Sequence, residues 1–403
     1  MKKIAIIYHC FVHYRLPVLQ ALSEQLNDEY EVTFISDVTS PHSRVAPLNF
    51  KALKNWKRLR NLWLGRWLWQ RGLVGDVLKN NYEVLILLGQ FNFISTWVVA
   101  ILARMRGQRV LFWSHGIYGN ESKLKLFLRE SFYRLSDGML LYGNYSRGLM
   151  IQHGFDPERL YVIYNSLNYE QQRSLRDSTH IDEINSEIKR LFGALSTLPL
   201  SVFIGRLTEV KKLDMLLFSL KKLMEKGIES NCLFVGDGPE RMRLEGIVAE
   251  LGISRNVKFY GECHDEAILS RLLAKANVCV SPGNVGLTAM HVMAYGTPVI
   301  THDDFKWQMP EFEAIEHRVT GSFFRSGSLE SLIEEMAYWL CLPPELSQKA
   351  RNDCVRVVEE YFNPDRQVAI VRQACAGAGA TEAGPLRVIK DRPESVFQVP
   401  PQN

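Results

Sequence analysis

The chain alternates short apolar runs with longer segments of helical periodicity. In the first half, the apolar runs are residues 3–9, 31–36, 83–89, 109–114, 138–143 and 161–165. They are nearly continuous in Ile, Leu, Val, Phe and Tyr, as strands buried on both faces of a parallel sheet are. Strands that alternate with helices in this way predict an α/β domain with a doubly wound sheet and right-handed crossovers.

A second series of apolar runs begins near residue 200. It comprises residues 200–205, 232–238, 257–262, 278–282, 298–302 and 321–324. A polar stretch that is poor in strand pattern, residues 168–196, separates the two series. Ligands of open α/β sheets bind beyond the carboxyl ends of the strands, so two such domains are expected to form a cleft. The predicted organisation is a first domain over 1–170, a linker with a helix over 171–196, a second domain over 197–362, a C-terminal helix over 363–377 and a disordered tail over 378–403.

Composition narrows the class of protein. The chain has 403 residues, of which 46% are hydrophobic and 23% charged, enough apolar material for two cores. A net charge of +4 does not indicate a nucleic-acid partner, and we expect none. The seven cysteines are isolated, which predicts reduced thiols and neither a disulfide framework nor a zinc site. No apolar run is long enough for a membrane span or a signal peptide, so we expect a cytoplasmic protein that is peripheral to a membrane.

Two basic residues follow the first strand of the second series. In SVFIGRLTEVKKLDMLL, Gly205 turns the chain after the strand and a helix is predicted from Leu213. Arg206 and Lys211 lie in the connection between them. A helix start disfavours cations unless an anion is bound there, and Arg and Lys are the usual ligands of phosphate oxygens. We therefore predict that Arg206 and Lys211 hold a diphosphate, with a solvated basic pair as the alternative.

A second connection has the features of an anion-binding loop. In VCVSPGNVGLTAMHVMAYGTPVI, a buried strand is followed by a Gly/Asn turn, and a helix is predicted to begin near residue 287. The first N–H groups of a helix have no partner within it and can hold a phosphate. Gly286, Leu287 and Thr288 are the residues predicted to contact it. An ordinary strand–helix loop remains the alternative.

Taken together, these segments resemble the family-4 glycosyltransferases. GRLTEVKKLD is similar to that family's GRL-x-x-x-K-G-x-D signature, and FVGDGP…VKFYG, HVMAYGTPVI and YVIYNSLN resemble three further blocks in the same order. The resemblance covers roughly residues 138–340, while residues 1–137 match in strand layout only. It implies the GT-B fold, in which two Rossmann-like domains face each other across a cleft. It also implies metal-independent, retaining transfer of a sugar from a nucleotide-diphosphate donor, with no cofactor.

The chain departs from the family at two positions. The family has glutamates that contact the donor sugar and the ribose, and the resemblance aligns them with Gly283 and His291. His291 can still hydrogen-bond a ribose hydroxyl, or it is a packed helix histidine. The resemblance also assigns Glu313 to the donor sugar. Because the glutamate pair is missing, a catalytically silent sugar-nucleotide-binding protein and a sugar-nucleotide epimerase of the same fold remain open, and so does inverting stereochemistry.

Three histidines follow strands of the first series. His115 comes after the strand at 109–114, and by resemblance it reaches the donor sugar as a catalytic residue. His9 and His13 follow the first strand and are candidates for the acceptor side. A structural role is the alternative for each.

The stretch at residues 51–79 interleaves four tryptophans with lysines and arginines, and it has no acidic residue before Asp76. Such a mixture suits the surface of an anionic membrane, where each basic residue contributes about 1 kcal/mol. It predicts an acceptor that is a glycan, lipid-linked or part of lipopolysaccharide or a surface polysaccharide. A helix packed on the first domain with a charged outer face is the alternative.

Overall fold

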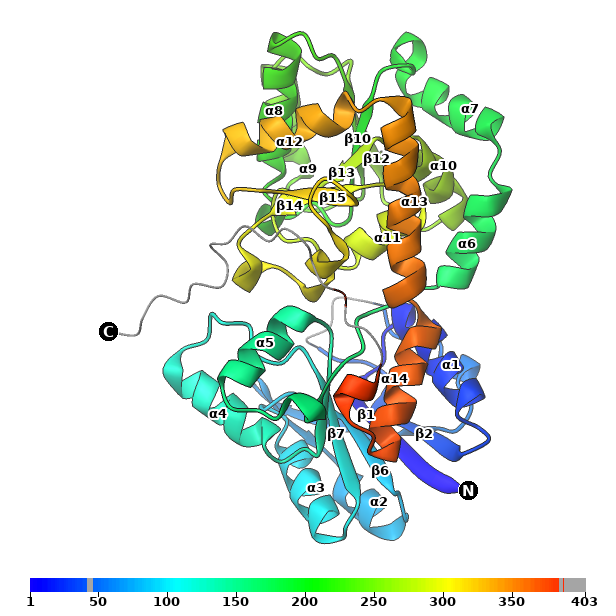
Figure 1. Ribbon diagram of the computed structural model, residues 1–403, viewed down its shortest axis with the longest axis vertical. Coiled ribbons are helices and arrows are strands. Elements are labelled where there is room, and N and C mark those ends of the chain that lie inside the picture. The colour runs from blue at the N-terminus through cyan, green and yellow to red at the C-terminus, as the bar shows by residue number, and fades with distance from the viewer. Residues whose placement is uncertain (42–45, 384–386, 388–403) are drawn as a thin grey trace. The chain divides into compact units, whose positions relative to one another are not determined.

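The computed structural model describes residues 1–41, 46–383 and 387, and its chain divides into two compact units (Figure 1). The first unit comprises Met1–Asn168 together with Phe362–Arg387. The second comprises Tyr169–Tyr361 among the described residues. The chain thus leaves the first unit once and returns to it for the last long helix.

The first unit is built on a seven-stranded parallel sheet in the order β3-β2-β1-β6-β7-β8-β9. All six apolar runs of the first half are confirmed as strands, because each is continuous in residues that pack on both faces. The strands are β1 (Lys2–Cys10), β2 (Tyr30–Asp37), β3 (Trp56–Arg58), β6 (Val84–Leu88), β7 (Arg109–Ser114), β8 (Gly138–Leu141) and β9 (Leu160–Val162).

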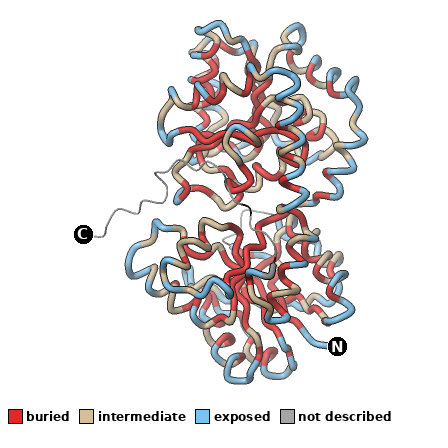
Figure 2. Tube along the Cα trace, in the orientation of Figure 1, coloured by how far each residue is buried: buried red, intermediate tan, exposed pale blue. Residues whose placement is uncertain are grey.

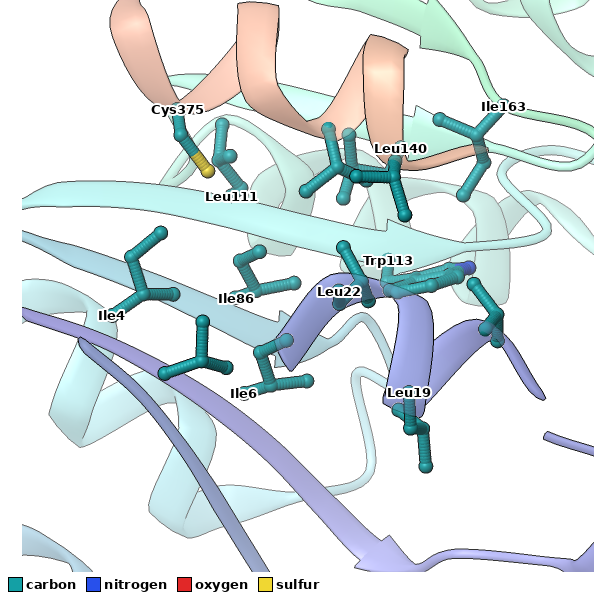
Figure 3. Close-up of a cluster of buried hydrophobic side chains, with 14 of the residues drawn as sticks. Ile4, Ile6, Leu19, Leu22, Ile86, Leu111, Trp113, Leu140, Ile163 and Cys375 are labelled. Atoms are coloured by element: carbon teal, nitrogen blue, oxygen red, sulfur yellow. The ribbon is translucent and has the colours of Figure 1, made fainter. Parts of the chain in front are cut away.

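Two apolar clusters cover the two faces of this sheet. Successive strand residues point to opposite faces, so Ile4 and Ile6 enter one cluster and Ala5 and Ile7 the other. The first cluster includes residues of α1 (Leu16–Gln25) and of α14 (Pro364–Ala376) (Figure 3). The second cluster packs under α2 (Leu73–Lys79), α3 (Ile94–Met105) and α4 (Lys123–Tyr133). Residues from the end of the chain therefore complete the first core.

The basic aromatic stretch at 51–79 is not one helix. It forms the edge strand β3, a hairpin of β4 (Asn61–Leu64) and β5 (Trp67–Gln70), and then α2. Gly65 has a φ of +58° at the first position of a two-residue turn, a conformation that glycine adopts without strain. Residues 61–70 alternate in burial with a period of two, so the packed-helix alternative is wrong for this part of the stretch.

The second unit has a six-stranded parallel sheet in the order β12-β11-β10-β13-β14-β15. The six runs of the second series are confirmed, and every strand except the edge strand β12 is buried along its length (Figure 2). The strands are β10 (Leu200–Ile204), β11 (Asn231–Val235), β12 (Val257–Gly261), β13 (Val278–Val280), β14 (Val299–His302) and β15 (Gly321–Phe324). The helices are α6 (Tyr169–Ser178), α7 (Ile181–Phe192), α8 (Leu213–Glu225), α9 (Arg241–Glu250), α10 (Glu266–Lys275), α11 (Thr288–Ala294), α12 (Leu329–Leu340) and α13 (Pro344–Tyr361).

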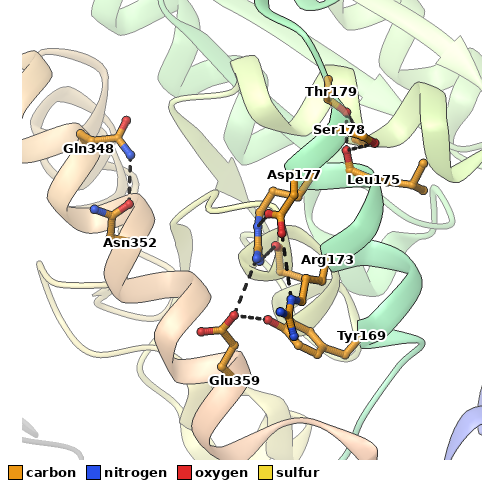
Figure 4. A network of polar contacts seen from close by, with 12 residues as sticks. Tyr169, Arg173, Leu175, Asp177, Ser178, Thr179, Gln348, Asn352 and Glu359 are labelled. Carbon is orange, nitrogen blue, oxygen red and sulfur yellow. Dashed lines mark hydrogen bonds and ion pairs between the residues drawn. The ribbon is translucent and has the colours of Figure 1, made fainter.

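The predicted linker forms two helices, α6 and α7, and α6 is bound to the rest of the second unit. Tyr169 donates a hydrogen bond to Glu359 of α13, and Arg176 lies 3.7 Å from the same carboxylate (Figure 4). Arg176 also donates to the carbonyl of Ala294 at 3.0 Å, at the C-terminus of α11. A cation is favourable at that end of a helix, so α6 stabilises α11.

Part of the tail predicted over 378–403 is described. Residues Ala380–Ala383 form a short 3-10 helix, and Thr381 contacts Glu158 of the first unit. Residues 384–386 and 388–403 lie outside the described part of the chain.

Candidate substrate-binding sites

Strand order locates a candidate site in each unit. The chain reverses its direction of winding between β1 and β6 in the first sheet and between β10 and β13 in the second. Open α/β sheets bind ligands outside the carboxyl ends of the strands at such a switch point. In the second unit, this position is occupied by the two segments that the sequence indicates as anion loops.

The two predicted anion loops contact each other in the second unit. The Thr288 hydroxyl donates to the carbonyl of Ile204 at 3.1 Å, which joins the start of α11 to the end of β10. The backbone N–H of Gly283 donates to the carbonyl of Lys211 at 2.9 Å. The Lys211 ammonium donates to the carbonyl of Asn284 at 2.7 Å and to its side-chain oxygen at 2.9 Å. Residues more than 70 positions apart therefore form one surface.

Arg206 is exposed at the turn after β10, and it has no hydrogen bond or ion pair with any described residue. Its backbone is fixed by close packing against the loop after β11. A Cβ on Gly236 would overlap the Gly205 carbonyl, and one on Gly238 would overlap the Leu207 carbonyl. The arginine side chain is thus an unengaged cation on a rigid turn, as binding of a phosphate requires.

Lys211 is partly buried, and burial lowers the pKa of its ammonium. An ammonium has three N–H donors, and Asn284 accepts two of them. The third donor remains for an anion. The next residue, Lys212, has a φ of +50° and precedes the first turn of α8.

The loop before α11 is held by a side chain that sequence reasoning missed. Gln308 accepts a hydrogen bond from the N–H of Val285 at 2.8 Å and donates to the hydroxyl of Thr301 at 2.9 Å. It thereby positions Gly286 and Leu287, which precede the seven-residue α11. Gln308 carries no recognisable motif, so only the fold identifies it.

The two positions of the missing glutamates have different surroundings. A Cβ on Gly283 would lie 2.7 Å from the Cα of Lys211 and closer still to the carbonyl of Val210, so no side chain fits there. His291 lies 3.2 Å from the carboxylate of Glu266, to which Tyr295 also donates at 2.7 Å. These contacts outweigh the effect of burial and lower the pKa of Glu266. A carboxylate from α10 therefore lies beside the position of the second missing glutamate.

Glu313 lies in a 3-10 helix, Pro310–Ala314, together with Glu311. Both carboxyl groups are buried, Glu313 with 1% exposure. The sequence assigned Glu313 to the donor sugar, and that assignment stays a prediction.

In the first unit, His115 follows β7 and packs against two tyrosine rings. Its ring centroid lies 4.6 Å from that of Tyr142 and 5.8 Å from that of Tyr118. Its Nδ1 is buried and has no hydrogen-bond partner among the described residues. Burial, together with the charges of Arg15 and Arg129, lowers the pKa of His115 to about 4. At neutral pH the imidazole is therefore uncharged and can exchange hydrogen bonds with a hydroxyl.

His9 and His13 have different environments. The His9 ring packs edge-on against Trp63 of the β4–β5 hairpin and against Phe93, with centroid distances of 6.1 and 5.4 Å. His13 is exposed, and its Nδ1 lies 3.4 Å from the carbonyl of Ala46. The structure thus places His9 against the hairpin and His115 against Tyr142, so these histidines do not form one group.

Among the described residues, every helix is too short or too polar to cross a bilayer. The surface of the β4–β5 hairpin is nevertheless strongly apolar. Leu62 and Trp69 face each other across the hairpin, as do Leu64 and Trp67, and all four are exposed.

Residues 18–171 match the family described as Glycosyltransferase Family 4, and residues 185–356 match Glycosyl transferases group 1. An uncharacterized glycosyltransferase of Methanocaldococcus jannaschii is 29% identical over 168 residues, 41% of this chain and 40% of that protein. A GDP-mannose-dependent alpha-(1-6)-phosphatidylinositol dimannoside mannosyltransferase of Mycobacterium tuberculosis is 34% identical over 114 residues, 28% of this chain and 29% of that protein. The matches thus span less than half the length of either relative.

The fold has a close counterpart among solved structures. The crystal structure of Anabaena HepE in complex with UDP superposes with a TM-score of 0.70 and 17% identity, and it covers 93% of this chain and 100% of that chain. The two family matches, one in each unit, and this shared architecture agree. The chain belongs to the family-4 type glycosyltransferases and has the GT-B fold.

Proposed function

We propose that the chain transfers a sugar from a nucleoside-diphosphate donor to a hydroxyl of a glycan or lipid-linked acceptor, without a metal ion. The observation that carries this proposal is the surface at the switch point of the second sheet, where the exposed Arg206 and the free donor of Lys211 lie on contacting loops. UDP is bound in the Anabaena structure and GDP-mannose is named for the mycobacterial relative, which supports a nucleotide-linked donor.

Catalysis requires contacts that strengthen as the donor bond breaks. Negative charge then builds on the departing diphosphate, and Arg206, Lys211 and the N–H groups at Gly286–Thr288 are donors to it. Arginine can bind two of its oxygens, and lysine contributes a point charge. These groups neutralise the leaving group, which is the task a metal performs in other transferases.

The acceptor proton needs a destination. With a pKa of about 4, His115 is a weak base at neutral pH and serves better as a hydrogen-bond partner of a substrate hydroxyl. In the retaining reaction, the leaving phosphate itself takes the proton. A retaining reaction therefore does not depend on His115 as a base.

A catalytically silent sugar-nucleotide-binding protein is the second candidate. The packing at Gly283 favours this silent binding protein, because no carboxylate can extend from this position towards a donor sugar. The donor site would then bind a sugar nucleotide without transferring the sugar.

The test is incubation of the purified chain with labelled UDP- and GDP-sugars and a lipid-diphosphate or glycan acceptor, with and without EDTA. We expect a labelled product that requires the acceptor, persists in EDTA and retains anomeric configuration. Conversion of the donor without an acceptor would indicate an epimerase. Donor binding with no product across the panel would support the silent protein.

We also propose that the β4–β5 hairpin docks on an anionic membrane. Its outward face presents Leu62, Leu64, Trp67 and Trp69, with Leu64 81% exposed, and Arg60, Arg66 and Arg71 lie beside them. Apolar side chains enter the interfacial layer while the arginines contact lipid phosphates. The name of the mycobacterial relative includes a phosphatidylinositol lipid, which supports a lipid-linked acceptor at the membrane.

Sedimentation with phosphatidylglycerol vesicles tests the docking surface. We expect Leu64→Asp with Trp67→Asp to reduce binding at least tenfold. Met242→Asp with Phe218→Asp is the matched control, because these apolar side chains of α9 and α8 are 85% and 40% exposed, similar to Leu64 and Trp67, and the two changes add the same charge. Equal sedimentation of the hairpin variant and the control would refute the assignment.

A further inference from the structure

Arg15 is a buried cation that the steps above do not use. It is the last residue of a 3-10 helix, His13–Arg15, that follows β1, and it is 8% exposed. Its guanidinium carbon lies 5.3 Å from the ring centre of Tyr8, 5.4 Å from Trp113, 5.5 Å from Tyr142 and 5.8 Å from Tyr14. It donates a hydrogen bond to the Tyr142 hydroxyl. Aromatic side chains therefore surround it.

No carboxylate of the described part of the chain compensates this charge. Among the described residues, Arg15 has no ion pair with an Asp or Glu, and its electrostatic partners are tyrosines. A second buried arginine of the same unit, Arg129, is paired with Glu121, and the two side chains are 8% and 1% exposed. Burial of an unpaired charge is unfavourable, and ring faces recover only part of the loss. The free protein therefore carries a cost at Arg15 that it does not carry at Arg129.

Two further buried nitrogens lie near Arg15 without a hydrogen-bond partner among the described residues. They are the Nδ1 of His115 and the indole nitrogen of Trp113. The His115 ring contacts Tyr142, and the Trp113 ring contacts the guanidinium. The indole N–H of Trp113 is a donor, and the Nδ1 of a neutral imidazole donates or accepts according to its tautomer. Buried polar groups are nearly always satisfied, so such nitrogens beside a cation indicate a missing hydrogen-bonding group.

Arg15, Tyr142, His115 and Trp113 form one cluster, the Arg15 cluster. Its surroundings are accessible from one side. His115 and its stacked neighbour Tyr118 are partly exposed, as is Tyr14. Arg15, His115 and Tyr142 follow the carboxyl ends of β1, β7 and β8, and Trp113 is the last but one residue of β7. The cluster is therefore at the carboxyl edge of the first sheet, where ligands of α/β sheets bind. A ligand group can therefore approach Arg15 along this rim.

We propose that the Arg15 cluster binds an oxyanion of the acceptor, a phosphate or a carboxylate, with the guanidinium as its counter-charge and His115 as a neutral donor beside it. The inference rests on the proposed function, since it concerns the acceptor of that reaction. Arginine's planar fork fits both kinds of oxyanion. The acceptor class is thereby narrowed to an acidic glycan or a phosphorylated carrier.

Binding of one sugar in three charge states tests this without catalysis. Glucose, glucuronate and glucose 6-phosphate are titrated at constant ionic strength into the full chain carrying Arg206→Ala and Lys211→Ala, which removes anion binding at the donor loops. At least one anionic sugar is expected to bind at least tenfold more tightly than glucose. The preference between carboxylate and phosphate then distinguishes the two acceptor sources.

Adding Arg15→Gln to that background is expected to abolish the preference for the anionic sugar. Arg15→Lys keeps the positive charge but lacks the planar guanidinium, and it is expected to retain part of the preference for the anionic sugar. Partial retention in this variant would show that the loss in Arg15→Gln is not caused by a folding defect. Equal binding of all three sugars, or a preference that survives Arg15→Gln, would overturn the proposal. Because no donor or transfer is involved, this outcome is independent of the proposed transferase reaction.

Thermal unfolding separates a ligand site from a structural cation. Without added anions, Arg15→Met is expected to keep or raise the melting temperature, because it removes an unpaired buried charge. Arg129→Met is expected to lower it, because Glu121 would be left buried and unpaired. A drop in melting temperature for Arg15→Met as large as that for Arg129→Met would show that Arg15 serves the packing of the rings, and would contradict the proposal.

Discussion

The carboxyl edges of the two sheets carry cations in opposite ways. In the second unit, Arg206 is exposed on a turn whose glycines pack backbone against backbone. In the first unit, Arg15 is buried among aromatic rings that come from separate strands. An exposed cation on a rigid turn costs the free protein little, whereas a buried one is retained at the expense of stability. The second sheet thus has an edge shaped by backbone packing, the proposed donor site, and the first sheet has an edge shaped by side chains, the proposed acceptor site.

The largest effect expected from this contrast is on the rate of sugar transfer. Arg206→Ala is expected to lower kcat/KM by roughly 10²–10³, because one preorganised donor to the leaving diphosphate is lost. The melting temperature should stay unchanged, since Arg206 has no partner among the described residues. Steady-state kinetics with saturating acceptor, beside thermal unfolding, measure both.

Arg255→Ala is the matched control for that variant, because Arg255 is an exposed arginine of the same unit outside the site. Similar kinetic losses in the two variants would mean that Arg206 acts through general charge and not as a ligand of the diphosphate.

At the carboxyl edge of the second sheet the loops pack backbone against backbone, so an added side chain is expected to clash there. Gly283→Ala should destabilise the fold by about 1–3 kcal/mol, because the new methyl group overlaps the Val210–Lys211 backbone. Gly286→Ala is the comparison, since the nearest atom to a Cβ there is 3.7 Å away on Met309. Chemical denaturation of the two variants measures the difference. Equal free energies of unfolding for the two variants would show that the loop shifts freely. The carboxyl edge of the second sheet would then not be a rigid backbone surface, and the contrast with the first sheet would fail.

The smallest expected effect concerns the uncharged His115 side chain at the carboxyl edge of the first sheet. The folded pKa of His115, about 4, is below its unfolded value of about 6.5, so the unfolded chain takes up the proton first. The stability from neutral His115 is therefore complete above pH 6.5 and is lost as pH falls towards 4. For this partly exposed ring, the loss between pH 7.5 and 5 should be about 1–2 kcal/mol.

Denaturation of the natural protein and of His115→Gln at both pH values isolates this contribution. The variant should lose less stability than the natural protein over the interval, because it has no imidazole to protonate. Parallel losses would place the His115 ring in contact with water and would remove the neutral donor from the Arg15 cluster.

The sequence predicted the carboxyl edge of the second sheet better than that of the first, and the reason is the way in which each edge is built. Arg206 and Lys211 lie within one short segment, so their residue types and the preceding glycine were sufficient to indicate an anion site. Arg15, Trp113 and Tyr142 come from three distant segments, and none has a motif. Glu266 and Gln308 were missed for the same reason, because Glu266 contacts His291 of α11 and Gln308 contacts the loop residue Val285, each more than 20 positions away. The hairpin at 61–70 was missed because its period-two pattern was interpreted as a single basic aromatic face.

By itself, the sequence determined the two parallel sheets, because strands buried on both faces must be continuous in apolar residues. It also determined the family and the basic character of the donor loops, because both are properties of contiguous segments. Only the tertiary structure decided that α14 completes the first core, that Gly283 has no room for a side chain and that Arg15 has no counter-charge among the described residues. The physical reason is that burial and pairing are relations between segments distant in sequence, and only the packed fold fixes the distances on which they depend.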